Sequence, residues 1–180
     1  NLVKVCIMKR IIRNVGLLLG GVLVAMTLFG CDNLKSPPEE RLADELCQKI
    51  IDALQKDDAD ALKKILAPEV LETDDLQVGI EYCMQLYNGT LISFESHGSH
   101  YQSVLGVGRS EKIVARYDIE TDTENYVLYF NHFMLNKDNQ DLEGIYSLKL
   151  VTAESEKDES NPGLDSDERK VIGIYNPEWG

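Results

Sequence analysis

The sequence is poor in cysteine, in proline and in positive charge. Its 180 residues include four Cys, five Pro and one Trp. So few cysteines exclude a disulfide-dense scaffold, and the low Gly and Pro content excludes collagen-like and low-complexity chains. The 18 basic residues are outnumbered by 31 acidic ones, which gives a net charge of −13. Because such a chain repels phosphate, we expect no nucleic-acid partner.

Motifs that identify common enzyme classes are also missing. The sequence has no G-x-S-x-G nucleophile elbow, no H-E-x-x-H zinc motif and no phosphate-binding loop. No His stands at metal-ligand spacing from a Cys in the mature domain, and the acidic stretch 154–168 lacks the spacing of an EF-hand. We therefore expect no bound metal and no cofactor.

The positive charge that is present is concentrated at the start. Residues 1–30 hold four bases and no acid, which leaves residues 31–180 with 14 bases, 31 acids and a charge of −17. Met8 opens a cationic stretch, and a 15-residue apolar block follows at 15–29. As a helix this block is about 22 Å long, which is short for a membrane span and typical of a secretory signal. We predict a start at Met8 and a signal peptide that ends at residue 30; an uncleaved anchor helix is the alternative.

The apolar block ends in Leu28, Phe29, Gly30 and Cys31. This ending resembles the bacterial lipoprotein signal, or lipobox, which has Leu three residues before Cys and a small residue directly before it. The resemblance implies that Cys31 carries diacylglycerol, becomes the mature N-terminus and holds the protein on the extracytoplasmic face of the cell membrane. Two or more acyl chains give stable attachment. Residues 31–40 then form a tether of up to roughly 30 Å, and the anionic bilayer repels the acidic domain.

Two cysteines, Cys47 and Cys83, remain in the mature domain. Both fall on predicted helices, on or beside the apolar faces. A disulfide between them is permitted outside the membrane. Two buried free thiols are the other interpretation, since Cys is among the most buried residue types.

Hydrophobic periodicity predicts helices first and strands afterwards. Apolar residues repeat at helical spacing over 38–56, 59–66 and about 73–87. Asp58 is the predicted N-cap of the second helix, Thr73 or Asp74 caps the third, and Pro68 ends the second. From residue 90 the period changes to two, which predicts strands at 90–106, bent near Gly98, and at 111–121, 126–135, 145–153 and 171–175. We expect residues 154–169 to form an acidic loop and residues 177–180 a tail.

Helices followed by a mostly antiparallel sheet make an α+β pattern. The first helix leads into the segment 56–70, where an acidic turn, a short helix and Ala67-Pro68 follow in order. This order resembles the nuclear-transport-factor-2-like (NTF2-like), or cystatin-like, superfamily over about 40–176. The chain also resembles bacterial lipoproteins of the Gram-positive type that carry a domain of unknown function. The superfamily resemblance implies an NTF2-like cone over 41–176, in which the helices pack on a curved sheet around a pocket; it implies no activity.

The candidate pocket residues are Tyr117, Tyr129 and His132. Superfamily members that are enzymes use Asp, His and Tyr inside the cone. His97 and His100 are a poor metal pair, because strand residues three apart do not share a face. Asp118 and the residues that alternate with it are predicted to face solvent on the opposite side of the sheet.

These observations favour non-catalytic binding of a small ligand or an envelope partner by a lipid-anchored protein. An isomerase-type or hydratase-type enzyme and a purely structural accessory protein of the envelope are the alternatives. A buried His or Asp beside a Tyr in a pocket would favour the enzyme. An exposed apolar patch would favour a partner-binding protein.

Overall fold

The computed structural model describes residues 36–157 and 173–175. The predicted signal peptide, the lipidation site Cys31, most of the tether, most of the acidic loop and the predicted tail lie outside the described residues. The chain divides into an N-terminal part that ends at Arg41 and a compact unit that begins at Leu42. Everything below concerns that compact unit, apart from the first turn of the helix that spans the boundary.

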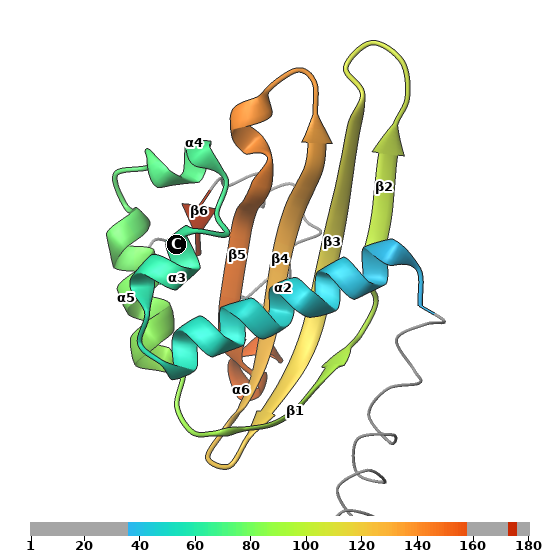
Figure 1. The fold of residues 1–180 in the computed structure, drawn as a ribbon. Coiled ribbons are helices and arrows are strands. Elements are labelled where there is room, and N and C mark those ends of the chain that lie inside the picture. The colour runs from blue at the N-terminus through green and yellow to red at the C-terminus, as the bar shows by residue number, and fades with distance from the viewer. Residues whose placement is uncertain (1–35, 158–172, 176–180) are drawn as a thin grey trace, which may run out of the picture. The chain divides into compact units, whose positions relative to one another are not determined.

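The first helix, α2 (Pro38–Gln55), confirms the predicted amphipathic helix. Leu46, Ile50 and Leu54 recur every four residues, so they share one face, and all three are buried in the core. Figure 1 shows α2 lying across the strands of the sheet. The apolar stripe read from the sequence is therefore the surface that covers the sheet.

The second helix, α3 (Ala59–Lys63), has the predicted cap. The Asp58 carboxylate accepts a hydrogen bond from the backbone N–H of Ala61 at 2.9 Å. Pro68, expected to end this region, instead begins a further helix, α4 (Pro68–Leu71). The first N–H groups of a helix have no partner within it, so a proline is tolerated at this position.

Helix α5 (Leu76–Leu86) starts later than the sequence predicts. The residue at its N-cap is Asp75, whose side chain makes no capping hydrogen bond. Thr73 donates its hydroxyl proton to the carbonyl oxygen of Val70 at 2.8 Å, so it closes the preceding turn. The prediction that Thr73 or Asp74 caps this helix is therefore wrong.

Six strands form one sheet in the order β1-β3-β4-β5-β6, with β2 also paired to β3. Neighbouring strands are antiparallel except β5 and β6, which are parallel. A short 3-10 turn, η1 (Gln140–Leu142), joins β4 to β5. The strands are β1 (Leu91–Ser96), β2 (His100–Val104), β3 (Ser110–Thr121), β4 (Asn125–Asn136), β5 (Gly144–Thr152) and β6 (Gly173–Ile174).

The long strand predicted at 90–106 is bent, as expected, near Gly98. Its two halves are β1 and β2, which pair side by side with the two ends of β3. Gly98 has φ of +105°, a conformation that residues with a Cβ rarely adopt. The glycine thus lets one edge of the sheet change direction without leaving β3.

The core lies between the sheet and the helices, on the side that we call the inner face. Tyr117 of β3 and Phe130 of β4 stack with ring centroids 6.0 Å apart, and the Tyr117 hydroxyl donates to the Asp44 carboxylate of α2 at 2.8 Å. Strand residues alternate between faces, so every second side chain of β3 enters this core. Those side chains belong to Ile113, Ala115, Tyr117 and Ile119.

Helix α5 closes the core at the far end of the strand order. Gly79 lets α5 approach β6 closely, because a Cβ at this position would lie 2.7 Å from the Cβ of Ile174. Ile174 is buried, and β6 pairs with β5 through Ser147 and Leu148. Two residues near the end of the chain therefore belong to the core.

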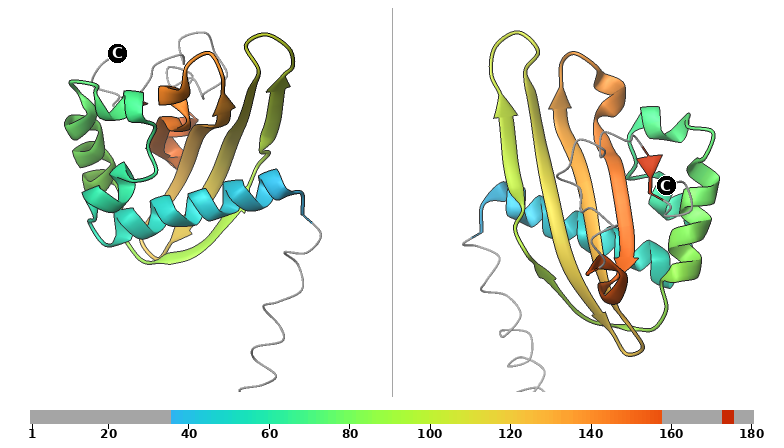
Figure 2. Two further views of the ribbon diagram at one scale, coloured as in Figure 1. Left: turned by 45° about the horizontal axis from the view of Figure 1, so that its top comes forward. Right: turned by 180° about the vertical axis from the view of Figure 1, so that it is seen from behind.

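The face of the sheet turned away from α2 is the outer face, seen in the right-hand view of Figure 2. A short helix, α6 (Ala153–Glu156), follows β5 and turns back onto it. Thr152 caps α6 by accepting a hydrogen bond from the Ser155 N–H at 3.2 Å. Residues 154–156, predicted as the start of the acidic loop, are thus helical.

The predicted fold class is confirmed at the level of architecture. The described residues form an α+β unit with a curved, open, mostly antiparallel six-stranded sheet and a few helices. None of the described helices is long and apolar enough to span a membrane.

Candidate functional site

The structure does not bring the three candidate pocket residues together. Tyr117 is opposite Leu128 in the register of β3 and β4, and both side chains are in the inner core. Tyr129 is the next residue along β4, so its side chain points to the outer face. A pocket made by Tyr117, Tyr129 and His132 is therefore not formed, because the sequence pattern did not separate the two faces of β4.

His132 is opposite Ile113 and is half-buried, and its Nδ1 has no hydrogen-bond partner in the described structure. Burial lowers the pKa of His132, and the positive charge of Lys49 lowers it further, while a backbone hydrogen bond at Gly144 partly opposes both. The imidazole is thus held in its neutral form. No ion pair joins His132 to a carboxylate within the described residues.

Cys47 and Cys83 are buried free thiols. Burial raises the pKa of Cys83 to about 12. The pKa of Cys47 is also raised, first by burial and then by the charge of Asp44. Because the thiolate is the reactive form, neither group is a nucleophile near neutral pH.

Polar side chains gather instead on the outer face, in a row that crosses three strands. Arg116 of β3 is directly opposite Tyr129 of β4, which is directly opposite Lys149 of β5. Residues paired in this way lie on the same face within reach of one another. Helix α6 places the Glu156 carboxylate over this row.

Arg116 is the centre of the resulting network. Its Nε donates to the Tyr129 hydroxyl at 3.2 Å, and its Nη2 donates to both carboxylate oxygens of Glu156 at 3.2 and 3.3 Å. Its Nη1 lies 3.0 Å from Oδ1 of Asp118, whose Oδ2 is 3.0 Å from Nε2 of His97. Tyr129 also donates its hydroxyl proton to Glu156. We call these five residues the outer-face network.

Contacts within the network move the pKa values of Arg116, Glu156 and Tyr129 away from neutrality. Partial burial alone would lower the pKa of Arg116, but hydrogen bonds to Tyr129 and Glu156 and the nearby carboxylates raise it. Burial alone would raise the pKa of Glu156, but hydrogen bonds from Tyr129 and Arg116 and the charges of Arg116 and Lys149 lower it. Burial and the bond to Glu156 raise the pKa of Tyr129, which Arg116 partly offsets. The network is therefore a fixed array of charges, with no proton exchanged by these three groups near pH 7.

Lys149 extends the array toward β6. It is buried, and its ammonium lies 4.7 Å from the ring centre of Tyr175 and 5.9 Å from that of Tyr129. A cation between aromatic faces is stabilised by the ring quadrupoles. On the outer face, side-chain contacts therefore continue from Arg116 on β3 to Tyr175, the residue after β6.

A groove of about 430 Å³, to whose lining three residues of the network contribute, is bounded by β1, β3, β4 and α6. Two residues of its lining are joined by a hydrogen bond, which the Ser93 hydroxyl donates to the Glu120 carboxylate at 3.1 Å. Four acidic side chains and two basic ones contribute to the lining, so the groove is polar and acidic. It is lined by Ser93, Glu95, Arg116, Asp118, Ile119, Glu120, Asn125, Tyr126, Val127, Ala153, Glu156 and Lys157.

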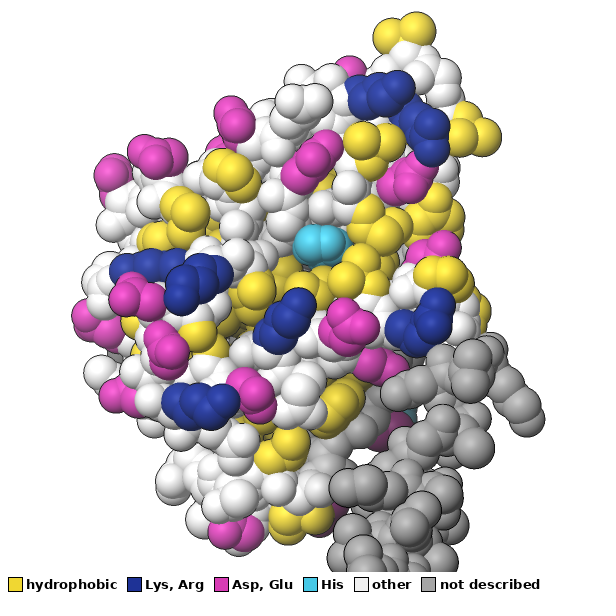
Figure 3. Space-filling model, viewed as in Figure 1, with side chains coloured by type: hydrophobic (Ala, Val, Ile, Leu, Met, Phe, Trp, Pro, Cys, Tyr) yellow, Lys and Arg dark blue, Asp and Glu magenta, His cyan; other side chains and the backbone are white. Residues whose placement is uncertain are grey.

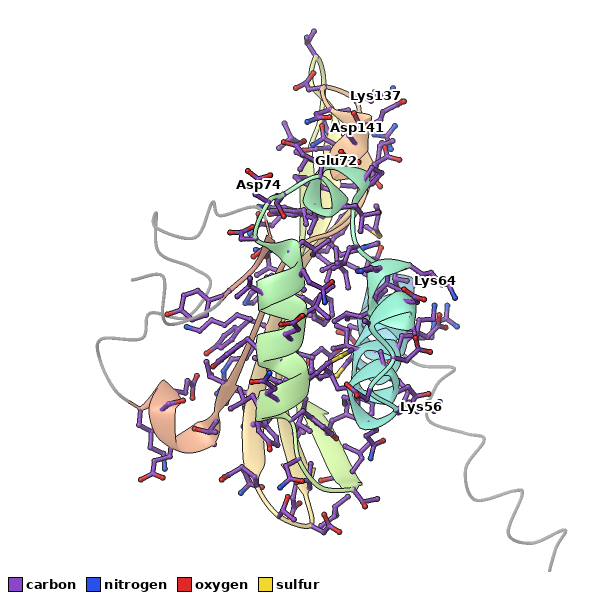
Figure 4. All side chains as sticks on the ribbon, turned by 90° about the vertical axis from the view of Figure 1, so that its left-hand side faces the viewer. Lys56, Lys64, Glu72, Asp74, Lys137 and Asp141 are labelled. Carbon is purple, nitrogen blue, oxygen red and sulfur yellow. The ribbon has the colours of Figure 1, made fainter. Side chains whose placement is uncertain are left out.

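A second groove, of about 350 Å³, lies between α4 and η1. Its lining includes Pro68, Glu69, Glu72 and Asp141. Figure 4 shows Glu72 and Asp141 near one another at one end of the unit. Within residues 36–157 and 173–175, no three His, Cys, Asp or Glu side chains are placed to hold a metal ion.

Alternation in β3 correctly predicted that Asp118 faces away from the core, but not that it pairs with Arg116 and His97. Glu156 was missed altogether, because it lies in a stretch whose composition indicates a loop. The partial signal for the site was the pattern Arg116-Tyr117-Asp118, in which charged residues alternate with a core residue. Glu156 reaches Arg116 only because the chain turns back after β5. No periodic pattern in the sequence predicts this turn.

A family profile with the description "Domain of unknown function (DUF5104)" matches residues 49–153. The match covers more than half of the chain and runs from α2 to the first residue of α6. It contains Arg116, Asp118 and Tyr129 and ends three residues before Glu156. No curated protein matches the chain.

Proposed function

The chain belongs to the family defined by this domain of unknown function, DUF5104, and we propose that it is a lipid-anchored extracytoplasmic protein that binds a polar ligand in the outer-face groove. The single observation that carries the binding role is the groove beside a prearranged network of charges. Binding sites are concave and use a few fixed polar groups to orient the ligand. Here Arg116 and Glu156 are held in place before any ligand arrives.

The network supports binding over catalysis. A general acid or base works best with a pKa near the working pH. The pKa of Arg116 is raised and that of Glu156 is lowered, so each keeps its charge at neutral pH. Fixed opposite charges orient a ligand that itself carries both donors and acceptors.

The lipid anchor is proposed from the leader sequence. Lys9 and Arg10 precede the apolar block that ends at Cys31, and the acidic charge begins only after it. In cells grown with radiolabelled palmitate, the wild-type chain is expected to take up label and Cys31→Ser is expected to lose it. Equal labelling of the two chains would contradict the anchor.

The binding role is tested by filling the groove. Ser93→Tyr places a ring beside Glu120, whereas Ser103→Tyr adds the same ring on the exposed strand β2, outside the groove lining. The full chain in detergent is screened by thermal shift against amines, amino acids, sugars and carboxylic acids. A ligand of the groove should stabilise wild type and Ser103→Tyr but not Ser93→Tyr. The same shift in all three, or none with any compound, would contradict the proposal.

The NTF2-like relationship is proposed on architecture. Helices that precede the strands and lie over one face of a curved antiparallel sheet support it. The ligand site we propose is on the other face, so it does not correspond to a cone pocket. An experimental structure with a different strand order would overturn the relationship.

A further inference from the structure

The turn between β2 and β3 exposes an unusual number of apolar side chains. Of the seven large hydrophobic residues exposed in the described part of the chain, four belong to this hairpin. Val104, Leu105 and Val107 are 56%, 78% and 105% exposed, and Tyr101 on β2 is 46% exposed. We call residues 104–108 the hairpin tip. Exposed apolar side chains gathered in this way mark an interaction site.

The hairpin tip is shaped as a projection. Gly106 and Gly108, with φ of +109° and +80°, make the tight turn. Figure 1 shows the hairpin extending past the neighbouring turn between β4 and β5. Two such narrow, convex tips would bury little surface against each other. A single tip can instead insert between the headgroups of a lipid bilayer.

Basic residues lie next to the apolar residues of the tip. Arg109 follows the tip, Lys112 lies three residues further on, and the N–H of Lys137 donates to the carbonyl of Arg109 at 3.0 Å. Figure 4 places Lys137 at the same end of the unit, and Figure 3 shows Lys and Arg side chains below the hydrophobic end. Glu111, paired with Arg109, and Asp138, beside Gly108, are the acidic neighbours. The tip itself carries no charge, and the residues named around it comprise three bases and two acids, in a chain whose net charge is −13.

We propose that the hairpin tip inserts into the headgroup region of an anionic bilayer. The proposal rests on the lipid anchor proposed above: Cys31 lies seven residues before Pro38, a span of at most about 25 Å, so the domain is held at the membrane. Aliphatic side chains backed by Lys and Arg are the chemistry that binds such an interface. The acidic remainder of the domain is repelled by the same lipids, so contact through the tip fixes the orientation of the domain.

Tryptophan fluorescence in vesicles tests this insertion. The lipidated full chain carrying Trp179→Phe receives one new Trp, either at Leu105 in the tip or at Val78, an exposed residue of α5 on the opposite side of the fold in Figure 1. Vesicles contain phosphatidylglycerol and phosphatidylcholine with brominated acyl chains. Leu105→Trp should shift to shorter wavelength and be quenched at least about twofold more than Val78→Trp, and less so without phosphatidylglycerol.

Mass spectrometry of the same samples reads whether Cys31 carries lipid, so the two proposals fail separately. If Cys31 is lipidated and both tryptophans stay solvent-like, tip insertion is wrong while the anchor stands. If Leu105→Trp is quenched on a chain without lipid, insertion is supported and the anchor is wrong. A blue shift of Leu105→Trp without vesicles that grows with protein concentration would show that a second copy covers the tip, which would overturn the proposal.

Discussion

On the inner face of the sheet, β3 and β4 present Tyr117 and Phe130 to the helices, whereas the adjacent positions on the outer face present Arg116 and Tyr129 to Glu156. The same strands therefore build an apolar core on one side and a hydrogen-bonded array of charges on the other. The inner contacts are mostly between buried apolar side chains. The outer contacts depend on charge, so we expect the faces to differ in how they respond to mutation and to pH.

The largest effect should come from the inner face. Phe130→Ala removes a fully buried ring that stacks on Tyr117 and should lower the free energy of unfolding by about 3–5 kcal/mol. Urea denaturation of the full chain in mild detergent measures it. Tyr129→Ala, the next residue on the same strand but on the outer face, is the matched control and should cost less. Equal losses of unfolding free energy in the two variants would show that packing on the outer face stabilises the fold as much as packing on the inner face.

A double-mutant cycle on Arg116 and Glu156 should give a coupling free energy that is smaller than the loss caused by Phe130→Ala. Arg116→Met, Glu156→Gln and the double variant should give a coupling of about 1–2 kcal/mol, since the pair is partly exposed and shares several hydrogen bonds. The exposed pair Lys56 and Asp52 is the control and should couple by less than about 0.5 kcal/mol. Similar couplings in both pairs would mean that the outer-face network adds no stability beyond a surface ion pair.

Tyr117→Phe tests the one polar contact described between β3 and α2 on the inner face. The variant keeps the ring and loses the hydrogen bond to Asp44, so the loss should be about 1 kcal/mol. In the Asp44→Ala background the same substitution should cost nearly nothing. An undiminished cost in that background would show that the ring position, and not the hydrogen bond, is responsible.

The smallest expected effects are on the pH dependence of the free energy of unfolding, to which His132 on the inner face and Glu156 on the outer face contribute over different pH ranges. The folded pKa of His132 is lowered, so its unfavourable contribution begins as the pH falls below 6.5, where the unfolded histidine starts to bind a proton. The folded pKa of Glu156 is lowered, so its favourable contribution is present above pH 4.5 and is lost as the pH falls below that value. Each slope stays below about 1.4 kcal/mol per pH unit, the limit for one proton.

Comparing the wild type with His132→Phe and Glu156→Gln isolates these slopes from those of other titrating groups. His132→Phe should flatten the stability curve as the pH falls below 6.5, whereas Glu156→Gln should flatten it only below 4.5. Stability curves that remain parallel to the wild type over both ranges would refute the assigned environments.

The sequence predicted the elements better than it predicted which residues meet. The core-facing residues of two elements were predicted correctly, because each set follows the repeat of its own helix or strand. They are the stripe of Leu46, Ile50 and Leu54 on α2 and the alternating residues around Tyr117 on β3. Pro68 was misread, because a proline that ends one helix also suits the first turn of the next. The candidate site failed for a different reason: β4 is buried on both of its faces, so its apolar pattern does not show that Tyr129 faces away from Tyr117 and His132.

Glu156 could not be predicted to join the site. Its neighbours are polar and acidic, so composition indicates a loop, and its contact with Arg116 spans 40 residues of sequence. Such a contact depends on the direction in which the chain turns after β5. That direction is set by the cap at Thr152. In the sequence this cap is visible only as one threonine hydroxyl, and threonines that bond to nearby backbone groups are also common in loops.

The pairing of Gly173–Ile174 with β5 bears on when the domain can fold. Ile174 fits against Gly79 of α5, so the core lacks one wall until residues 173–174 have been synthesised. The strand β6, which is made after all the other described strands, therefore sets the earliest point at which this core can close.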